Sequence, residues 1–158
     1  QLLGLGLVPP TVEKSHGGRK GSLQLFMKIQ RGSPYKDPQK KLIFQRGQDK
    51  QNALDYILQN RDRTEFNIFS TQGGNAVSID NGVSMTGFGS PHGFWFSSQK
   101  GTRRHLRTEE GRQLIEKLRT LRNTRFEEEA TNYFGTHDTQ RMMNRIDDLI
   151  NYYDLFVK

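Results

Sequence analysis

A turn signal between two short apolar runs constrains the fold of this chain most strongly. Residues 67–70 read Asn-Ile-Phe-Ser, Gln-Gly-Gly follows shortly after, and residues 76–79 read Ala-Val-Ser-Ile. Strand-like runs on both sides of a glycine-rich turn predict a β-hairpin. Such a hairpin would fold Asp80, which follows the second run, back beside Asn67, which starts the first. Gly82 would then let the backbone turn away sharply.

The polar residues around this hairpin have the types and the order of a phosphoryl-transfer site. Asp62 and Asn67 form an Asp-x-x-x-x-Asn pattern, and Asp80 follows the hairpin. A kinase needs one carboxylate near the attacking hydroxyl, an amide oxygen on one magnesium ion and a second carboxylate on the metal at the phosphates. Magnesium keeps water and substrate oxygens as further ligands, so one amide and one carboxylate suffice from the protein. We therefore expect ATP and Mg²⁺ as cofactors.

The sequence around these residues resembles a known family. Residues 53–69, ALDYILQNRDRTEFNIF, and residues 76–82, AVSIDNG, are similar to the catalytic core of atypical kinases of the phosphatidylinositol 3- and 4-kinase superfamily. The similarity is greatest to the type II phosphatidylinositol 4-kinase-like and secretory-pathway kinase branch, which carries Asp-Tyr-(Leu/Ile)-x-x-Asn-x-Asp-Arg and Ile-Asp-Asn-Gly. Residues 2–28 also resemble bacterial members, in Val-Pro-x-Thr-Val and Gly-Ser-Leu-Gln-Leu. The resemblance covers residues 1–85 and is weak beyond them.

The resemblance implies an α+β fold, namely a protein-kinase-like carboxy-terminal lobe that is mostly helical with short β-hairpins. Residues 1–30 would form the last strands of the amino-terminal lobe and the hinge, and residues 31–158 the carboxy-terminal lobe. A kinase also needs a glycine-rich loop over the phosphates, a strand lysine and a helix glutamate. These would precede Gln1, so we expect the amino-terminal lobe to be largely absent.

The resemblance further implies a role for each candidate site residue. Asp62 would be the catalytic base or would orient the hydroxyl, and Asn67 and Asp80 would bind magnesium. Arg63 is a second candidate catalytic residue, which would pair with Asp62 or with phosphate. A structural salt bridge is an equally good interpretation of Arg63. The residues that would line the nucleotide are Gln24, Leu25, Phe26, Met27 and Phe69.

One position departs from the family pattern. Many relatives have histidine after the Asp-Arg pair, whereas this chain has Thr64. The missing imidazole would weaken any stabilisation that it gives to the transition state in those relatives. A second glycine-rich stretch, residues 16–21, is interpreted as a hairpin turn between strands at residues 8–14 and 21–28, in preference to a phosphate cradle.

The net charge predicts an anionic partner. The chain carries a formal charge of +7 with a pI near 9.8, which favours contact with nucleotides, phospholipid headgroups, acidic peptides or nucleic acid. Much of this charge lies in residues 28–50 and 100–107, which we interpret as loops. These loops are either a solvated surface or the binding site of an anionic partner.

Helical periodicity predicts three helices and is missing from one segment between them. A helix is expected to begin at Asp49 or Gln51 and to end at Leu58. Residues 83–101 lack a helical period and would correspond to an activation segment. Thr108 is expected to cap a helix whose apolar stripe contains Leu114, Leu118 and Leu121. The last helix would begin at Asp138 or Thr139 and bury one apolar face, formed by Met142, Ile146, Leu149, Ile150 and Tyr153.

Other sequence features set limits on localisation and metal chemistry. No apolar run approaches the roughly 20 residues of a membrane span, and the mean hydropathy is −0.82. We therefore expect a soluble protein and favour the cytoplasm. The chain contains no cysteine, which excludes disulfides and thiolate ligands. The four histidines, His16, His92, His105 and His137, have no metal-ligand spacing and are expected in loops or on the surface.

Two functions of different classes remain from the sequence. The first is an ATP- and Mg²⁺-dependent phosphotransferase whose acceptor is a protein hydroxyl or an inositol lipid. The second is a catalytically inactive, kinase-like module that binds an anionic partner such as nucleic acid. The motifs around the hairpin favour the first, and the expected lack of an amino-terminal lobe favours the second.

Overall fold

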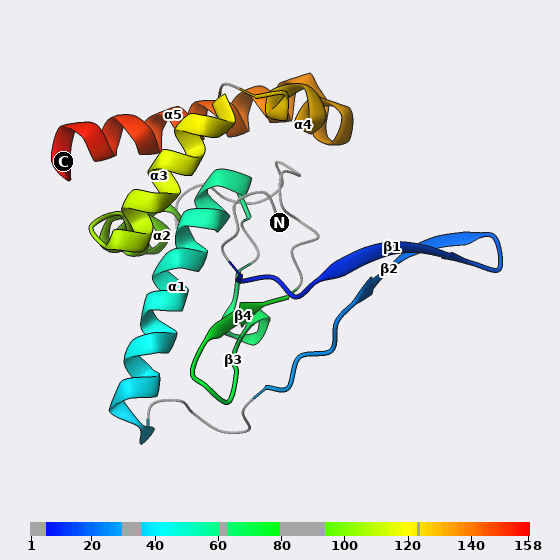
Figure 1. The fold of residues 1–158 in the computed structure, drawn as a ribbon, viewed down its shortest axis with the longest axis horizontal. Helices are drawn as coiled ribbons and strands as arrows, with labels where there is room; N and C mark the ends of the chain where they lie inside the picture. The colour runs from blue at the N-terminus through cyan, green and yellow to red at the C-terminus, as the bar shows by residue number, and fades with distance from the viewer. Residues whose placement is uncertain (1–5, 30–35, 61–62, 80–93, 123) are drawn as a thin grey trace.

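The computed structural model describes residues 6–29, 36–60, 63–79, 94–122 and 124–158, and the structural statements below concern these residues. The fold class is α+β, as expected, with α-helices and two small antiparallel sheets (Figure 1). The strands are β1 (Thr11–His16), β2 (Arg19–Gln24), β3 (Ile68–Ser70) and β4 (Ala76–Ser78). The helices are α1 (Pro38–Leu58), the 3₁₀ turn η2 (Glu65–Asn67), α2 (Phe94–Leu106), α3 (Glu109–Arg122), α4 (Phe126–Phe134) and α5 (Thr136–Phe156).

Strands β1 and β2 form an antiparallel hairpin that projects away from the helices (Figure 1). The turn lies at Gly17 and Gly18, whose φ angles of 56° and 75° are in the left-handed region that favours glycine. The hairpin interpretation of residues 16–21 is therefore confirmed. The strands are displaced from the predicted ranges, because pairing begins at Thr11 and ends at Gln24.

Strands β3 and β4 form the second predicted hairpin. Ile68 pairs with Ser78 and Ser70 with Ala76. The Ser78 N–H donates to the Leu7 carbonyl at 2.7 Å, which joins the segment before β1 to the edge of this hairpin. An isolated bridge between Ile29 and Thr71 joins the segment after β2 to its other edge.

Helix α1 begins eleven residues or more before the predicted start, so the interpretation of residues 38–50 as part of a loop was wrong. The Asp37 carboxylate accepts hydrogen bonds from the backbone N–H groups of Gln39 and Lys40, at 2.9 and 3.2 Å. Pro38 follows it at the start of the helix, where its fixed φ angle is suitable and its missing N–H is not needed. The predicted end at Leu58 is confirmed.

Helix α2 was also not predicted. Residues 94–106 are helical, so the interpretations of residues 94–101 as non-helical and of residues 100–106 as part of a loop were wrong. Residues 83–93 of the predicted activation segment lie outside the described residues. The amino-terminal half of this helix is rich in aromatic residues and serine, which gives little helical signal. Packing against α1 supports the helix instead, because Thr102, His105 and Leu106 are all buried.

Helix α3 has its predicted cap, since the Gly111 N–H donates to the Thr108 hydroxyl at 3.1 Å. Helix α5 begins at Thr136, directly after Gly135 and earlier than Asp138. Its predicted apolar face is confirmed, because Met142, Ile146, Leu149 and Tyr153 are buried and Ile150 packs against them.

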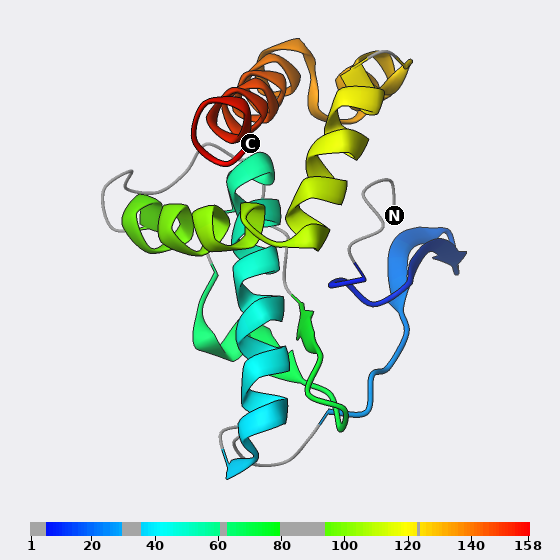
Figure 2. The same cartoon turned by 60° about the vertical axis from the view of Figure 1, so that its left-hand side comes forward.

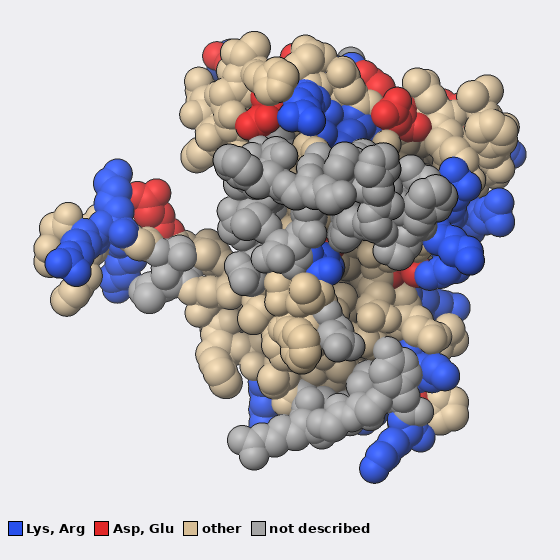
Figure 3. Space-filling model, turned by 180° about the vertical axis from the view of Figure 1, so that it is seen from behind, with Lys and Arg blue, Asp and Glu red and all other residues tan. Residues whose placement is uncertain are grey.

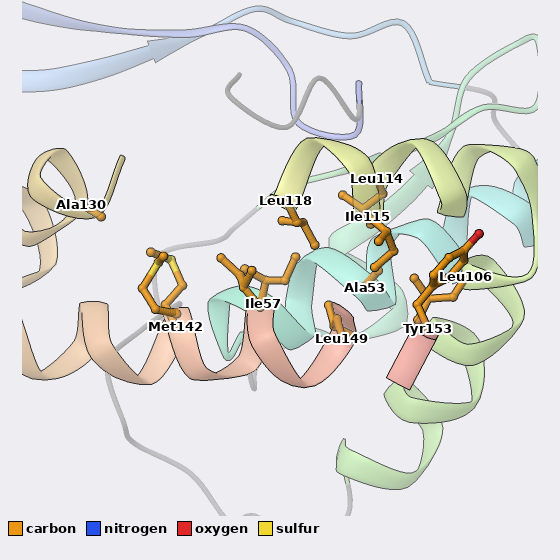
Figure 4. Close-up of a cluster of buried hydrophobic side chains, with 12 residues drawn as sticks. Ala53, Ile57, Leu106, Leu114, Ile115, Leu118, Ala130, Met142, Leu149 and Tyr153 are labelled. Atoms are coloured by element: carbon orange, nitrogen blue, oxygen red, sulfur yellow. The ribbon is translucent and has the colours of Figure 1, made fainter. Parts of the chain in front are cut away.

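The hydrophobic core lies between the helices. Figure 2 shows α2 crossing α1, with α5 beyond the carboxy-terminal end of α1. Figure 4 shows core side chains from α1, α2, α3 and α5 converging. Those with no more than 1% exposure are Ala53, Ile57, Leu106, Leu114, Ile115, Leu118, Met142, Met143 and Ile146. Burial of one such Leu or Ile side chain stabilises the fold by about 1.5–3 kcal/mol.

Within the described ranges, no helix is both long enough and apolar enough to cross a membrane.

Candidate functional site

The candidate site is built at the open end of the β3–β4 hairpin. The Ile79 N–H donates to the Asn67 carbonyl at 2.9 Å, which extends the antiparallel pairing by one residue beyond β3 and β4. Asn67 thus lies beside the residue that precedes Asp80 in the sequence. Asp80 and Asp62, the two predicted carboxylates, lie outside the described residues.

Thr64 orients the Asn67 side chain. The Thr64 hydroxyl donates to Asn67 Oδ1 at 3.1 Å and accepts the Phe66 N–H at 3.3 Å, so it also caps η2. The sequence marked Thr64 only as the replacement for a family histidine. The structure gives it a local function, because a hydrogen-bonded amide oxygen keeps one orientation.

Arg63 forms the structural salt bridge that the sequence left as one of its alternatives. Its Nε donates to Asp55 Oδ2 at 2.9 Å and its Nη2 to Asp55 Oδ1 at 3.0 Å. Both side chains are buried, at 7% and 1% exposure. The guanidinium Nη1 also donates to the carbonyl oxygens of Ile79, at 2.9 Å, and Asn67, at 3.3 Å. One side chain thereby holds α1, Asn67 and the end of the hairpin together.

Asp55 and Gln51 belong to this arrangement and were missed from the sequence. Gln51 Nε2 donates to Asp55 Oδ1 at 2.8 Å, and both residues are 1% exposed. They are four residues apart on α1, so they share a helix face with the apolar side chains. The signal in the sequence that could have identified them is a pair of polar residues at positions of the helix that are expected to be buried, because buried polar groups require partners.

Four of the five predicted adenine-binding residues, 24–27, lie at the end of β2 and on the segment that follows it, and Phe69 lies on β3. The Leu25 N–H donates to the Pro10 carbonyl at 2.8 Å, so this backbone amide, predicted to face the adenine, already has a partner. The side chains of Leu25 and Phe26 are 58% and 91% exposed. Met27 and Phe69 are half-buried, and Gln24 ends β2 with its side-chain amide on Thr11. The Ile29–Thr71 bridge brings this segment against the hairpin that carries Asn67.

The described part of the chain contains one of the two predicted magnesium ligands, Asn67. No group of three His, Asp or Glu side chains in this part is arranged to hold a metal ion. Asn67 Oδ1 is an oxygen of the type that magnesium takes as a ligand, and it accepts a hydrogen bond from the Thr64 hydroxyl. The Asn67 amide oxygen is therefore of a type that suits magnesium, and Asp80 would be the second protein ligand.

The two basic segments form one edge of the molecule. Residues 38–50 and 100–106 belong to helices α1 and α2, which pack together. Arg104 forms an ion pair with Asp49, with its Nε 2.9 Å from Oδ2 and its Nη2 2.5 Å from Oδ1. Figure 3 shows Lys and Arg side chains along this edge and on the β1–β2 hairpin.

His105 lies in the interior, so the expectation of a surface or loop position was wrong for this histidine. It is 4% exposed, and its Nε2 has no hydrogen-bond partner. Burial, and then the positive charge of Lys50, lower its pKa from the usual value of 6.5, while Glu110 and Asp49 act in the opposite direction. His16 and His137 are exposed as expected, and His92 lies outside the described residues.

No protein-family model matches this chain, and the searches of curated proteins and of solved structures gave no match to it.

Proposed function

We propose that this chain is a kinase-like phosphotransferase domain that uses ATP and magnesium. The observation that carries the proposal is the pairing of Asn67 with Ile79, at 2.9 Å, next to Asp80 in the sequence. This pairing supports the expectation that an amide and a carboxylate ligand come from the two ends of one hairpin. The family resemblance of residues 1–85 supports the same function.

Each candidate residue has one role in the proposed reaction. Asn67 Oδ1 and the Asp80 carboxylate hold magnesium, which neutralises charge on the nucleotide phosphates when it is bound. The Asp62 carboxylate accepts the proton of the acceptor hydroxyl, or orients that hydroxyl toward the terminal phosphate. Residues 24–27 and Phe69 contact the adenine.

Arg63 acts as a positioning residue in this proposal. Its guanidinium contacts the carbonyl oxygens of Asn67 and Ile79 and is itself held by Asp55. Phosphoryl transfer depends mainly on positioning and charge stabilisation, and small displacements of a ligand reduce the rate strongly. The buried ion pair therefore fixes the two backbone positions on which the metal ligands depend.

The acceptor is proposed as a protein hydroxyl or an inositol lipid. The test is transfer of a labelled γ-phosphate from ATP, with magnesium, to a protein mixture or to vesicles that contain phosphatidylinositol. We expect transfer by the native sequence and a loss of at least about 100-fold in Asp62→Asn, because general-base catalysis contributes about 10²–10⁴-fold. Equal transfer by both proteins would contradict the role of Asp62, and no transfer with any acceptor would count against the activity.

A binding function for an anionic partner such as nucleic acid is the second candidate. The observation that favours it is the packing of α1 on α2, which brings two basic segments together. Binding through phosphate contacts weakens steeply with salt. The logarithm of the binding constant falls with the logarithm of the salt concentration, with a slope of about −0.7 per phosphate contact on a single strand. Fluorescence anisotropy of a single-stranded oligonucleotide at several salt concentrations tests this candidate. A salt-dependent affinity that falls in Lys41→Gln supports it, and lack of binding at low salt excludes it.

A further inference from the structure

A cleft lies on the molecule away from Asn67. Its volume is about 330 Å³, near the lower limit of the roughly 300–1,000 Å³ usual for small-molecule sites. Helix α1, the junction of α2 and α3, the residues before β1 and the closed end of the β3–β4 hairpin all line it. Asn75 and Ala76 are the hairpin residues in the cleft, whereas Asn67 and Ile79 lie at the other end of the same hairpin.

The two carboxylates in this cleft already have donors within the protein. Asp49 forms the two-bond ion pair with Arg104 described above. Glu110 lies in the first turn of α3, where its own backbone N–H donates to its carboxylate. This backbone hydrogen bond is the main cause that lowers the pKa of Glu110 from its usual value of 4.5. Neither acid therefore requires a cationic ligand.

The two cations in the cleft lack such partners. Arg46 and Lys50 are four residues apart on α1, so they project from one face of the helix. Neither forms an ion pair with a carboxylate in the part of the chain that the structure describes. Burial lowers the pKa of Lys50 from its usual value of 10.5, although the charge of Glu110 raises it. The Lys50 ammonium is thus partly removed from water without a bound counterion.

His105 adds a third unsatisfied polar group. It lines the cleft from α2, it is 4% exposed, and its Nε2 has no hydrogen-bond partner. Buried polar groups normally have partners, so an unpaired one beside a cleft indicates a place for an absent ligand. Among the described residues, the cleft therefore contains two cations without an ion-pair partner and one histidine nitrogen without a hydrogen-bond partner.

We propose that this cleft binds a small phosphomonoester. A guanidinium and an ammonium one helix turn apart suit a phosphate, because Arg donates two parallel hydrogen bonds and Lys supplies a point charge. The cleft is larger than inorganic phosphate requires, and Leu7, Ile43 and Ala76 supply apolar contacts for an uncharged ligand body. This site is separate from the proposed magnesium site and does not depend on phosphoryl transfer.

The test is calorimetric titration with glycerol 3-phosphate, in the presence of a metal chelator so that the proposed kinase site does not contribute. Acetate is the comparison ligand for a single carboxylate. We expect saturable binding of glycerol 3-phosphate and at least about tenfold weaker binding in Arg46→Gln and in Lys50→Gln, because each loses a charge-assisted hydrogen bond. Glu110→Gln is expected to bind more tightly, since it removes a negative charge and keeps a side-chain oxygen.

Control variants separate this site from general charge effects. Lys14→Gln removes one exposed positive charge on the projecting β1–β2 hairpin and should bind as the native protein does. Asn67→Ala should also bind normally, so a failure of the proposed kinase function leaves this test intact. Circular dichroism confirms that each variant is folded. Lack of saturable binding, equal affinity for acetate, or unchanged affinity in Arg46→Gln and Lys50→Gln would overturn the proposal.

Discussion

Arg63 and Asp55 form a two-bond salt bridge in the interior, with Nε 2.9 Å from Oδ2 and Nη2 3.0 Å from Oδ1. Removing two charges from water is costly, and only good geometry with further hydrogen bonds offsets that cost. Both conditions are met, because Gln51 donates to Asp55 while Arg63 donates to the carbonyl oxygens of Ile79 and Asn67. The pair therefore connects the core helix α1 to the candidate metal ligand.

Removing one partner of this pair should destabilise the protein strongly. We expect Asp55→Asn to lower the free energy of unfolding by about 3–5 kcal/mol, because it leaves Arg63 charged and buried without its counterion. Urea denaturation measures the change. Arg112 and Glu109 form a matched pair on the surface, at 60% and 57% side-chain exposure. Arg112→Gln should leave the urea midpoint almost unchanged, because exposed ion pairs contribute little, and an equally small change for Asp55→Asn would refute the buried role.

Gly111 is required by the contact between the start of α3 and the end of α2. A Cβ at this position would lie 2.1 Å from the His105 carbonyl oxygen and 2.6 Å from Leu106 Cα. Gly111→Ala should therefore destabilise the fold by about 1–3 kcal/mol, as overpacking does. At an exposed helix position the same change would stabilise the helix, because alanine has a higher helix propensity than glycine. Gly21→Ala is the control, because a Cβ there would meet nothing within 4 Å. Equal urea midpoints for the two variants would contradict the packing described.

His105 should make stability depend on pH. Its folded pKa lies below the usual 6.5, chiefly through burial and then through Lys50, while Glu110 and Asp49 oppose the shift. The unfolded chain then binds more protons below about pH 6.5, so stability is full above that value and falls as the pH decreases toward the folded pKa. We expect urea midpoints to decrease from pH 7.5 to pH 5 and to decrease less in His105→Asn. Identical pH profiles would show that His105 is not the cause.

Tyr56 provides an independent test of the contact between α1 and α5. Burial raises its pKa from 10.0 to about 12, and the nearby Asp148 charge and hydrogen bond add to the shift. The Tyr56 hydroxyl lies 3.4 Å from Asp148 Oδ2. Because the folded pKa is higher than the unfolded one, protonated Tyr56 stabilises the folded state fully below pH 10, and this contribution is lost as the pH rises through about 12. An ultraviolet titration, with Tyr56→Phe subtracted, should show a lower Tyr56 pKa in Asp148→Asn. An unchanged value would exclude this contact.

Local signals in the sequence were enough for the β3–β4 hairpin and for the cap of α3. The glycine-rich turn and the strand-forming residues on both sides of it predict the β3–β4 pairing, and Thr108 predicts the start of α3. These elements depend on residues close together in the chain. Their local preferences therefore agree with the final structure.

The elements that sequence analysis missed depend on tertiary contacts. The Lys- and Gln-rich start of α1 has a weak apolar stripe, and only Asp37 and Pro38 indicate where the helix begins. Helix α2 is supported by the burial of Thr102 and Leu106 against other elements, which no local propensity encodes. The choice of Asp55 as the partner of Arg63 likewise required the three-dimensional structure.

The most direct test of the proposed kinase function is calorimetric titration of this chain with ATP in the presence of magnesium. The comparison variants are Asn67→Ala and Asp80→Asn, which each remove a proposed metal ligand. Gln72→Ala, at an exposed position in the turn of the same hairpin, is the matched control. We predict magnesium-dependent binding by the native sequence and by Gln72→Ala, and loss of that binding in Asn67→Ala and Asp80→Asn. Binding that is equal in all four proteins, or absent from the native sequence, would contradict this prediction.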